Sequence, residues 1–182
     1  MTTPALGFAV FDTAIGWCGI AWRDAALCGL QLPGADVDRT RARMRGSFPG
    51  VAELAPPPWV ARVQARMQAA LAGEPDAMLD VPLDMAGVPP FHQRVYEVAR
   101  AIAPGRTLIY GEVAAALGEP GASRAVGQAL GANPFAPIVP CHRVLAAGNR
   151  GGGFSAPGGV DTKLRMLLNE KARFGSEPGL FD

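Results

Sequence analysis

The stretch Ile138-Val139-Pro140-Cys141-His142-Arg143-Val144 places a cysteine and a histidine side by side at the end of an apolar run. Pro140 has a fixed φ and restricts Val139 to an extended backbone, so the cysteine follows a stiff segment. A free thiol has a pKa of about 8.5 and attacks as the thiolate, and a neighbouring imidazole is a natural activating group. Buried cysteine is common, however, so the pair alone favours a structural role for Cys141 over a nucleophilic one.

The composition is that of a globular protein. The 182 residues are 49% hydrophobic and 18% charged, which excludes a disordered chain and allows one large domain or two small ones. The net charge is only +1, but residues 1–87 carry 7 Lys/Arg and 9 Asp/Glu, whereas residues 88–182 carry 10 and 7. This asymmetry permits a nucleic-acid partner for the second half without proving one.

The chain has three cysteines, Cys18, Cys28 and Cys141. Their number is odd and they lack the spacing of a disulfide framework or a zinc site, so we expect free thiols and no metal. The first residues lack the basic start of a signal peptide, and no apolar run is long enough to cross a membrane. We therefore expect a cytoplasmic protein in a reducing compartment, with no membrane partner.

The first half begins with three short strands joined by tight turns, which predict an antiparallel meander. The strands are expected at residues 6–11, 17–22 and 26–32. Two helices follow, at 38–44 and 59–71. The first is arginine-rich, and its arginines are predicted to form a solvated face. The second has apolar residues at helical spacing, which predict a core face: Val60, Val63, Met67 and Leu71.

A further short strand is predicted at residues 78–83. The segment Gly87-Val88-Pro89-Pro90 is rigid and lacks periodicity, which makes it a domain boundary. We therefore expect an N-terminal α/β domain, residues 1–87, that supports the function, and a C-terminal domain, residues 88–182.

The C-terminal half is mostly helical. Helices are predicted at 91–102, 110–117, 122–130 and 163–170, the last with Leu164, Leu167 and Leu168 buried. The second and third are short and joined by a tight glycine-containing turn, which is typical of a helix-turn-helix.

The helix at 122–130 carries mostly small side chains: Ala122, Ser123, Ala125, Gly127 and Ala129. They are compatible with close helix packing, or with close approach to a nucleic-acid backbone. Large polar side chains of the kind that read bases are scarce in this helix apart from Gln128, and Arg124 is its one long cation. If the helix binds DNA, this composition favours the minor groove or weak sequence preference over major-groove readout.

The second half resembles the DNA alkyltransferases that repair O6-alkylguanine, the methylated-DNA–protein-cysteine methyltransferases. The resemblance is close over residues 91–170, is looser before them, and rests first on the PCHRV motif at 140–144. Further matches at the family's spacing are Tyr110, Arg124, Asn133-Pro134, Phe154-Ser155, Gly158-Gly159, Lys163 and Glu170. The resemblance implies an α+β fold: a small antiparallel sheet with flanking helices, ribonuclease-H-like, followed by a mostly helical domain with a winged helix-turn-helix.

The resemblance also implies the catalytic roles. Cys141 would accept the alkyl group, His142 would take the thiol proton through a bound water, and Glu170 would orient His142. Arg143 is expected to form a structural ion pair.

Substrate-binding roles follow from the same resemblance. Tyr110 would donate toward guanine N3, and Ser155, with Phe154 beside it, would bind O6. The carbonyls of Cys141 and Val144 would accept from the exocyclic amine. Asn133 would tie the turn before the cysteine to the helix-turn-helix.

The implied partner is double-stranded DNA that carries O6-alkylguanine, with O4-alkylthymine as a second substrate. The damaged base must be flipped out to reach the thiol. Arg124 would fill the vacated space while its helix lies in the minor groove through Ala122, Ser123, Ala125, Gly127 and Gln128. Damaged DNA is the alkyl donor, so no cofactor is expected. The thioether is inert, so each molecule should react once. We expect a monomer that clusters on nucleoid DNA.

Ala156-Pro157 is a two-residue insertion relative to many family members and leaves open the size of the alkyl groups accepted. Three other functions compete. A non-catalytic lesion-binding relative would carry another residue, often tryptophan, in place of Cys141. A DNA-binding regulator would need base-reading side chains that the helix at 122–130 lacks. A cysteine hydrolase would need an oxyanion hole and would turn over.

Overall fold

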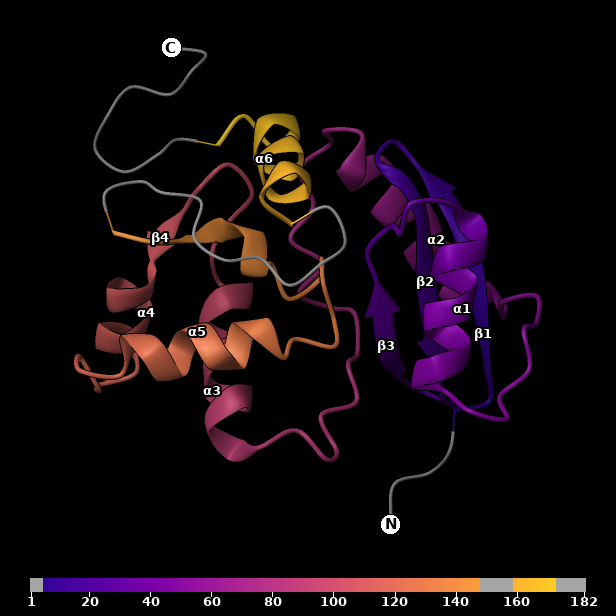
Figure 1. The fold of residues 1–182 in the computed structure, drawn as a ribbon, viewed down its shortest axis with the longest axis horizontal. Coiled ribbons are helices and arrows are strands. Elements are labelled where there is room, and N and C mark those ends of the chain that lie inside the picture. Colours follow the sequence, from indigo (N-terminus) through magenta and orange to yellow (C-terminus); the bar gives the residue numbers. More distant parts are fainter. Residues whose placement is uncertain (1–4, 148–158, 173–182) are drawn as a thin grey trace.

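The computed structural model describes residues 5–147 and 159–172, and its two halves lie side by side along the longest axis of the molecule (Figure 1). The N-terminal half contains a three-stranded antiparallel sheet in the order β1-β2-β3. These strands are β1 (Gly7–Thr13), β2 (Gly16–Trp22) and β3 (Leu27–Gln31). The predicted meander is confirmed, and Cys18 and Cys28 lie in its strands as free thiols.

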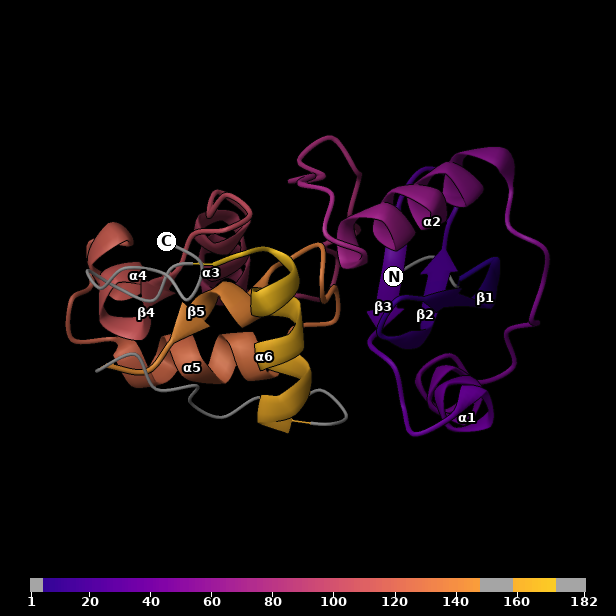
Figure 2. The ribbon, with the colours of Figure 1, turned by 90° about the horizontal axis from the view of Figure 1, so that it is seen from above.

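Helices α1 (Val37–Ser47) and α2 (Pro58–Leu71) cover opposite faces of this sheet (Figure 2). Helix α1 begins after Asp36, whose carboxylate accepts the N–H of Arg39 at 2.8 Å and so satisfies a free donor of the first turn. Three of its four arginines are exposed, which agrees with the predicted solvated face: Arg39, Arg43 and Arg45. The four core residues predicted for α2 are all buried.

The strand predicted at residues 78–83 is wrong. Only Leu83 forms a bridge to another strand, and Met78 has a φ of 49°, which a β-strand does not allow. Side chains hold this backbone instead. Asp76 accepts the N–H of Met78 at 2.9 Å, and Arg100 donates to two carbonyls of the segment at 2.7 and 3.1 Å. These side chains satisfy the first part of the segment, and its pairing with β3 is limited to the bridge at Leu83, where Leu27 of β3 donates to the carbonyl of Pro82 at 2.9 Å.

The C-terminal half contains α3 (Pro90–Arg100), α4 (Tyr110–Ala116), α5 (Ser123–Gly131) and α6 (Gly159–Asn169). Helix α5 packs against both α3 and α4. The buried hydroxyl of Tyr96 on α3 donates to the carbonyl of Ala129 on α5 at 2.7 Å and fixes how the two helices meet. The predicted pair of short helices joined by a tight turn is confirmed in α4 and α5.

Two short parallel strands, β4 (Leu108–Ile109) and β5 (Val144–Leu145), connect distant parts of this half. Strand β4 ends directly before Tyr110, whereas β5 begins directly after the turn that holds Cys141. Their pairing therefore brings the start of α4 to the cysteine turn.

The buried face of α6 differs from the prediction. Leu167 is buried, but Leu164 and Leu168 are 38% and 43% exposed. The buried positions are instead Lys163, Met166 and Leu167. The ammonium of Lys163 donates to the carbonyl of Val144 at 2.7 Å, and this bond turns the polar side chain inward and two leucines outward.

Buried side chains from both halves belong to one hydrophobic core, which joins Phe11 and Met67 to Val95, Ile138 and Met166. The α3 helix begins at Pro90, so the predicted boundary falls in the connection that leads into it.

In the part of the chain that the structure describes, no helix is both long enough and apolar enough to cross a membrane.

Candidate active site

Cys141 opens a single 3-10 turn, Cys141–Arg143, directly before β5. Its N–H donates to the carbonyl of Val139 at 2.9 Å, and its own carbonyl accepts the N–H of Val144. The residue is only 8% exposed. The stiff segment before it thus holds the thiol at the edge of the core.

His142 and Arg143 both turn toward Glu170, the residue that follows α6. His142 Nε2 lies 2.8 Å from Glu170 Oε1, and Arg143 contacts both carboxylate oxygens at 2.6 to 3.2 Å. Arg143 also donates to the carbonyl of Ile102 at 2.8 Å, which confirms its predicted ion-pairing role. His142 Nδ1 is buried and has no hydrogen-bond partner among the described residues.

The charges of this cluster follow from burial and from the hydrogen bonds. Burial by itself raises the pKa of the Glu170 carboxyl, but the hydrogen bonds from His142 and Arg143 lower it to about 2, so the group is ionised at neutral pH. An ionised carboxylate only accepts hydrogen bonds, so the Nε2–H of His142 donates. Burial lowers the pKa of His142, and the contact with Glu170 offsets this only in part. His142 is therefore a neutral imidazole with Nδ1 free to accept a proton.

The charge state of the Cys141 thiol is set by opposing effects. Burial raises its pKa, whereas a hydrogen bond from the Asn133 side chain and the nearby charge of Lys163 lower it. Burial also lowers the pKa of Lys163 to about 8, so this fully enclosed side chain is mostly a cation at neutral pH. The thiol thus has a neutral base as its neighbour in the turn and a cation close by.

Asn133 lies just after α5 and holds the segment that leads to the cysteine. Its Nδ2 donates to the carbonyl of Val139 at 2.8 Å, and its Oδ1 accepts the N–H of Phe135 at 2.9 Å. The side chain therefore connects α5 to the cysteine turn, as the resemblance implied.

Two tyrosines lie near the thiol. Burial raises the pKa of Tyr110 at the start of α4, and the charge of the nearby Cys141 thiolate adds to this. Burial, with the same neighbour, raises the pKa of Tyr96 to about 12. Both phenols keep their protons at neutral pH, but Tyr96 already donates to Ala129, so Tyr110 is the donor available for a ligand.

The predicted DNA-contacting residues lie on α5 or directly before it. Arg124 and Gln128 are exposed and lie on successive turns of the helix. The four small residues of the predicted DNA-contacting set are partly exposed: Ala122, Ser123, Ala125 and Gly127. A Cβ atom on Gly127 would lie 3.9 Å from the Tyr110 ring, so this helix passes close to the site.

Only some of the other predicted substrate-binding residues lie in the part of the chain that the structure describes. Phe154, Ser155 and the Ala156-Pro157 insertion lie outside the described residues. Val144 is described, and its carbonyl already accepts Lys163, which leaves one lone pair for a ligand.

Sequence reasoning assigned no role to three side chains that shape the site: Lys163, Tyr96 and Asn169. A signal for Lys163 was present, because residues 163, 166, 167 and 170 have the spacing of one helix face and include the matched Glu170. The acceptors of Tyr96 and Asn169 are backbone carbonyls of distant segments, which no sequence pattern reveals.

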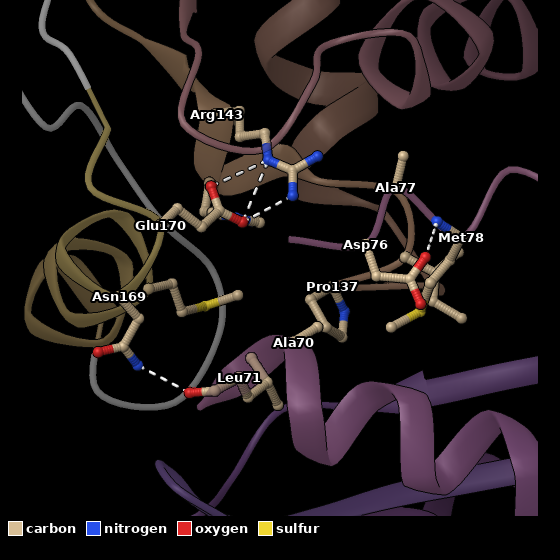
Figure 3. A pocket seen from close by; sticks show the side chains of 12 residues that line it. Ala70, Leu71, Asp76, Ala77, Met78, Pro137, Arg143, Asn169 and Glu170 are labelled. Carbon is tan, nitrogen blue, oxygen red and sulfur yellow. Dashed lines mark hydrogen bonds and ion pairs between the residues drawn. The ribbon is translucent and has the colours of Figure 1, made fainter. Parts of the chain in front are cut away.

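A pocket lined in part by His142 and Glu170 lies where the end of α2 meets the end of α6 (Figure 3). Its polar lining includes Asp76, Arg143, Asn169 and Glu170. Asn169 Nδ2 crosses from α6 to the carbonyl of Leu71 on α2 at 2.8 Å. No group of three or more potential metal ligands occurs within residues 5–147 and 159–172.

The residues that build this site fall within one recognised domain. Residues 90–172 match the family model described as 6-O-methylguanine DNA methyltransferase, DNA binding domain. The match begins where α3 begins and includes Tyr110, the cysteine turn and Glu170. The C-terminal half is thus a DNA-binding domain of the alkyltransferase class.

Full-length relatives identify the family. The chain is 35% identical to the methylated-DNA–protein-cysteine methyltransferase of Mycobacterium bovis over 178 residues, 96% of this chain and 98% of the relative. It superposes on the crystal structure of Mycobacterium tuberculosis OGT in complex with DNA with a TM-score of 0.72, covering 97% and 99% of the two chains at 35% identity. A DNA base-flipping protein of Thermus thermophilus is 45% identical over 111 residues, 61% of this chain and 73% of the relative. The chain belongs to the methylated-DNA–protein-cysteine methyltransferase family.

Proposed function

We propose that this chain repairs O6-alkylguanine in DNA by transferring the alkyl group irreversibly to Cys141, once per molecule. The observation that carries the proposal is the position of Cys141 directly before a neutral histidine that Glu170 orients. O4-alkylthymine is proposed as a second substrate, because it offers the same alkyl–oxygen bond.

The reaction is an in-line displacement. His142 Nδ1 takes the Cys141 proton through a water molecule while Glu170 stabilises the imidazolium that forms. The sulfur bonds to the alkyl carbon as the bond from that carbon to O6 breaks, and the electron pair of the broken bond remains on guanine. The cation of Lys163 favours the thiolate electrostatically. Guanine takes up one proton, so the charge balances without a cofactor.

Guanine leaves more readily when its developing charge is stabilised. Tyr110 keeps its proton because its pKa is raised, and it donates toward N3. The second lone pairs of the Cys141 and Val144 carbonyls accept from the exocyclic amine. Ser155, beside Phe154, is assigned to O6. The Ala156-Pro157 insertion leaves open the size of the alkyl groups accepted.

DNA binding is assigned to the C-terminal domain, residues 88–182. We propose that α4 and α5, with β4 and β5, form a winged helix-turn-helix whose α5 enters the minor groove. Its small side chains permit close approach, and Arg124 occupies the space that the flipped base leaves. Residues 1–87 form a ribonuclease-H-like supporting domain. The protein is proposed to act as a monomer on nucleoid DNA in the cytoplasm, where several molecules cluster.

A second candidate function is recognition of alkylated bases without transfer. It is favoured by the 45% identity to a protein named for base flipping. The presence of Cys141 beside its proton acceptor supports transfer instead.

Intact-mass spectrometry separates the two functions. After incubation with an O6-methylguanine oligonucleotide, we expect one added methyl group, mapped to the peptide that contains Cys141. The Cys141→Ala variant should bind the same oligonucleotide without any gain in mass. Folded wild-type protein that binds the lesion but never gains mass would establish the second function.

A further inference from the structure

The ends of α2 and α6 are joined by a hydrogen bond between residues far apart in the sequence. Asn169, the last residue of α6, donates from Nδ2 to the carbonyl of Leu71, the last residue of α2, at 2.8 Å (Figure 3). Carbonyls in the last turn of a helix have no donor within that helix, so this carbonyl is a natural acceptor for an outside group. The bond ties the N-terminal half to the helix that leads to Glu170.

The backbone at the end of α6 is also enclosed by two glycines. Gly73, after α2, has a φ of 109°, and a Cβ atom there would lie 3.3 Å from the carbonyl oxygen of Asn169. Gly105 has a φ of 84°, and a Cβ atom there would lie 3.2 Å from the carbonyl oxygen of Glu170. Both halves of the molecule therefore contact this helix end with bare backbone.

Glu170 is the residue where the helix stops. The N–H of Lys171 donates to Leu168 and that of Ala172 to Leu167, both at 3.0 Å, and Lys171 has a φ of 52°. This is the Schellman arrangement, with Glu170 as the C-cap. A short chain of contacts thus runs from Leu71 through Asn169 and Glu170 to His142.

We propose that Asn169 is a positioning residue for the transfer reaction. By fastening the end of α6 to α2, it sets the Glu170 carboxylate against His142 Nε2, and the N-terminal half thereby contributes to the orientation of the proton acceptor. The inference rests on the proposed function, in which His142 accepts the proton of the Cys141 thiol. A hydrogen bond of 2.8 Å leaves little room for displacement, and errors of about 1 Å in catalytic geometry cost about 100-fold in rate.

The test compares Asn169→Ala with wild type and with Leu168→Ala, a matched control at an exposed neighbouring position of the same helix. Single-turnover methyl transfer should slow roughly tenfold or more in Asn169→Ala and remain unchanged in Leu168→Ala. Because contact with Glu170 raises the pKa of His142, the acid limb of the pH–rate profile should also move to lower pH in Asn169→Ala. Asn169→Gln keeps an amide donor and should recover part of the rate.

Nuclear magnetic resonance gives a readout that does not depend on transfer. The chain has two histidines, so ¹⁵N-histidine labelling yields His142 beside an internal reference, His92. The ring shifts of His142 should change in Asn169→Ala, while those of His92 stay fixed. If Asn169→Ala does not fold, Asn169→Asp, which has the same size but no N–H donor, takes its place.

The outcomes are distinguishable. If wild type gains no methyl group, the proposed function fails. If wild type reacts but a folded Asn169 variant keeps the wild-type rate, acid limb and His142 shifts, Asn169 is only a structural contact and the inference is overturned.

Discussion

Lys163, on the buried face of α6, and Glu170, the C-cap of that helix, lie nearly two turns apart, and both contact the chain at the cysteine turn. Lys163 Nζ donates to the carbonyl of Val144 at 2.7 Å, and Glu170 Oε1 accepts from His142 Nε2 at 2.8 Å. Seven residues make nearly two full turns of an α-helix, so one rigid element carries both groups. The cation that favours a thiolate and the anion that orients the base therefore keep a constant separation.

The first prediction concerns the acid limb of the reaction. Burial lowers the pKa of His142 below its ordinary 6.5, and Glu170, with a pKa of about 2, stays ionised throughout. The single-turnover rate constant should therefore hold as the pH falls through 6.5 and decline only in more acidic solution, where the imidazolium forms. Rapid-quench assays of methyl transfer from about pH 5 to about pH 8 measure this rate constant.

Glu170→Gln provides the matching variant for this prediction. It removes the negative charge that raises the pKa of His142, so the acid limb should move to still lower pH while the plateau rate falls. A half-maximal rate at pH 6.5 or above in wild type would contradict a buried, neutral His142.

The second prediction concerns stability in alkaline solution. Burial lowers the pKa of Lys163 from 10.5 to about 8. Between these values the unfolded chain binds a proton that the folded chain does not, so the contribution of Lys163 to the free energy of unfolding rises with pH. The full rise is on the order of 3 kcal/mol. Below about pH 8 both states are protonated and the contribution is constant.

Urea unfolding of wild type and Lys163→Met at about pH 7 and about pH 10 isolates this effect, because the other alkaline groups titrate in both proteins. The stability of wild type relative to the variant should increase toward the higher pH. If the difference in free energy of unfolding between wild type and Lys163→Met is the same at both pH values, Lys163 is not desolvated.

The third prediction concerns the residue that ends α6. Lys171 has a φ of 52°, a left-handed conformation that a side chain disfavours. Lys171→Gly should raise the free energy of unfolding by about 1 kcal/mol, measured by urea titration. Lys171→Ala removes the same charge but keeps the Cβ atom, so it should give no such gain. An equal gain from alanine would assign the effect to charge and not to the backbone.

Much of this architecture follows from local sequence patterns. Short runs of strand-forming residues joined by tight turns are sufficient for the β1–β3 meander, and helical spacing in α2 identifies Val60, Val63, Met67 and Leu71 as core. The site was located through the PCHRV motif together with matches about 30 residues to either side of it, from Tyr110 to Glu170, because Cys141 and His142 alone favour a structural interpretation.

The structural features that were predicted wrongly depend on single polar contacts between residues far apart in the sequence. Residues 78–83 are apolar enough for a strand, but Asp76 and Arg100 bind the backbone of Met78 and Val81, and only a single bridge, at Leu83, connects the segment to β3. In α6 the apolar stripe at 164, 167 and 168 competes with one bond from Lys163 to Val144, and that bond decides which side faces inward. A hydropathy pattern places apolar residues inward, so it does not show that the ammonium of Lys163 is buried.

The last prediction concerns Arg124, which is exposed on α5 beside the small side chains proposed to enter the minor groove. If Arg124 fills the gap left by a flipped base, it stabilises a state that exists only in duplex DNA, because a single strand has no partner base to separate from. Arg124→Ala should therefore slow methyl transfer from a duplex by tenfold or more and alter transfer from the matching single strand much less. Arg62→Ala, an exposed arginine on α2, removes the same charge elsewhere and should affect neither substrate. Equal losses on both substrates would reduce Arg124 to a phosphate contact, since the loss of such a contact weakens binding to either form of DNA. Single-turnover rates on the two oligonucleotides at one salt concentration decide between these roles.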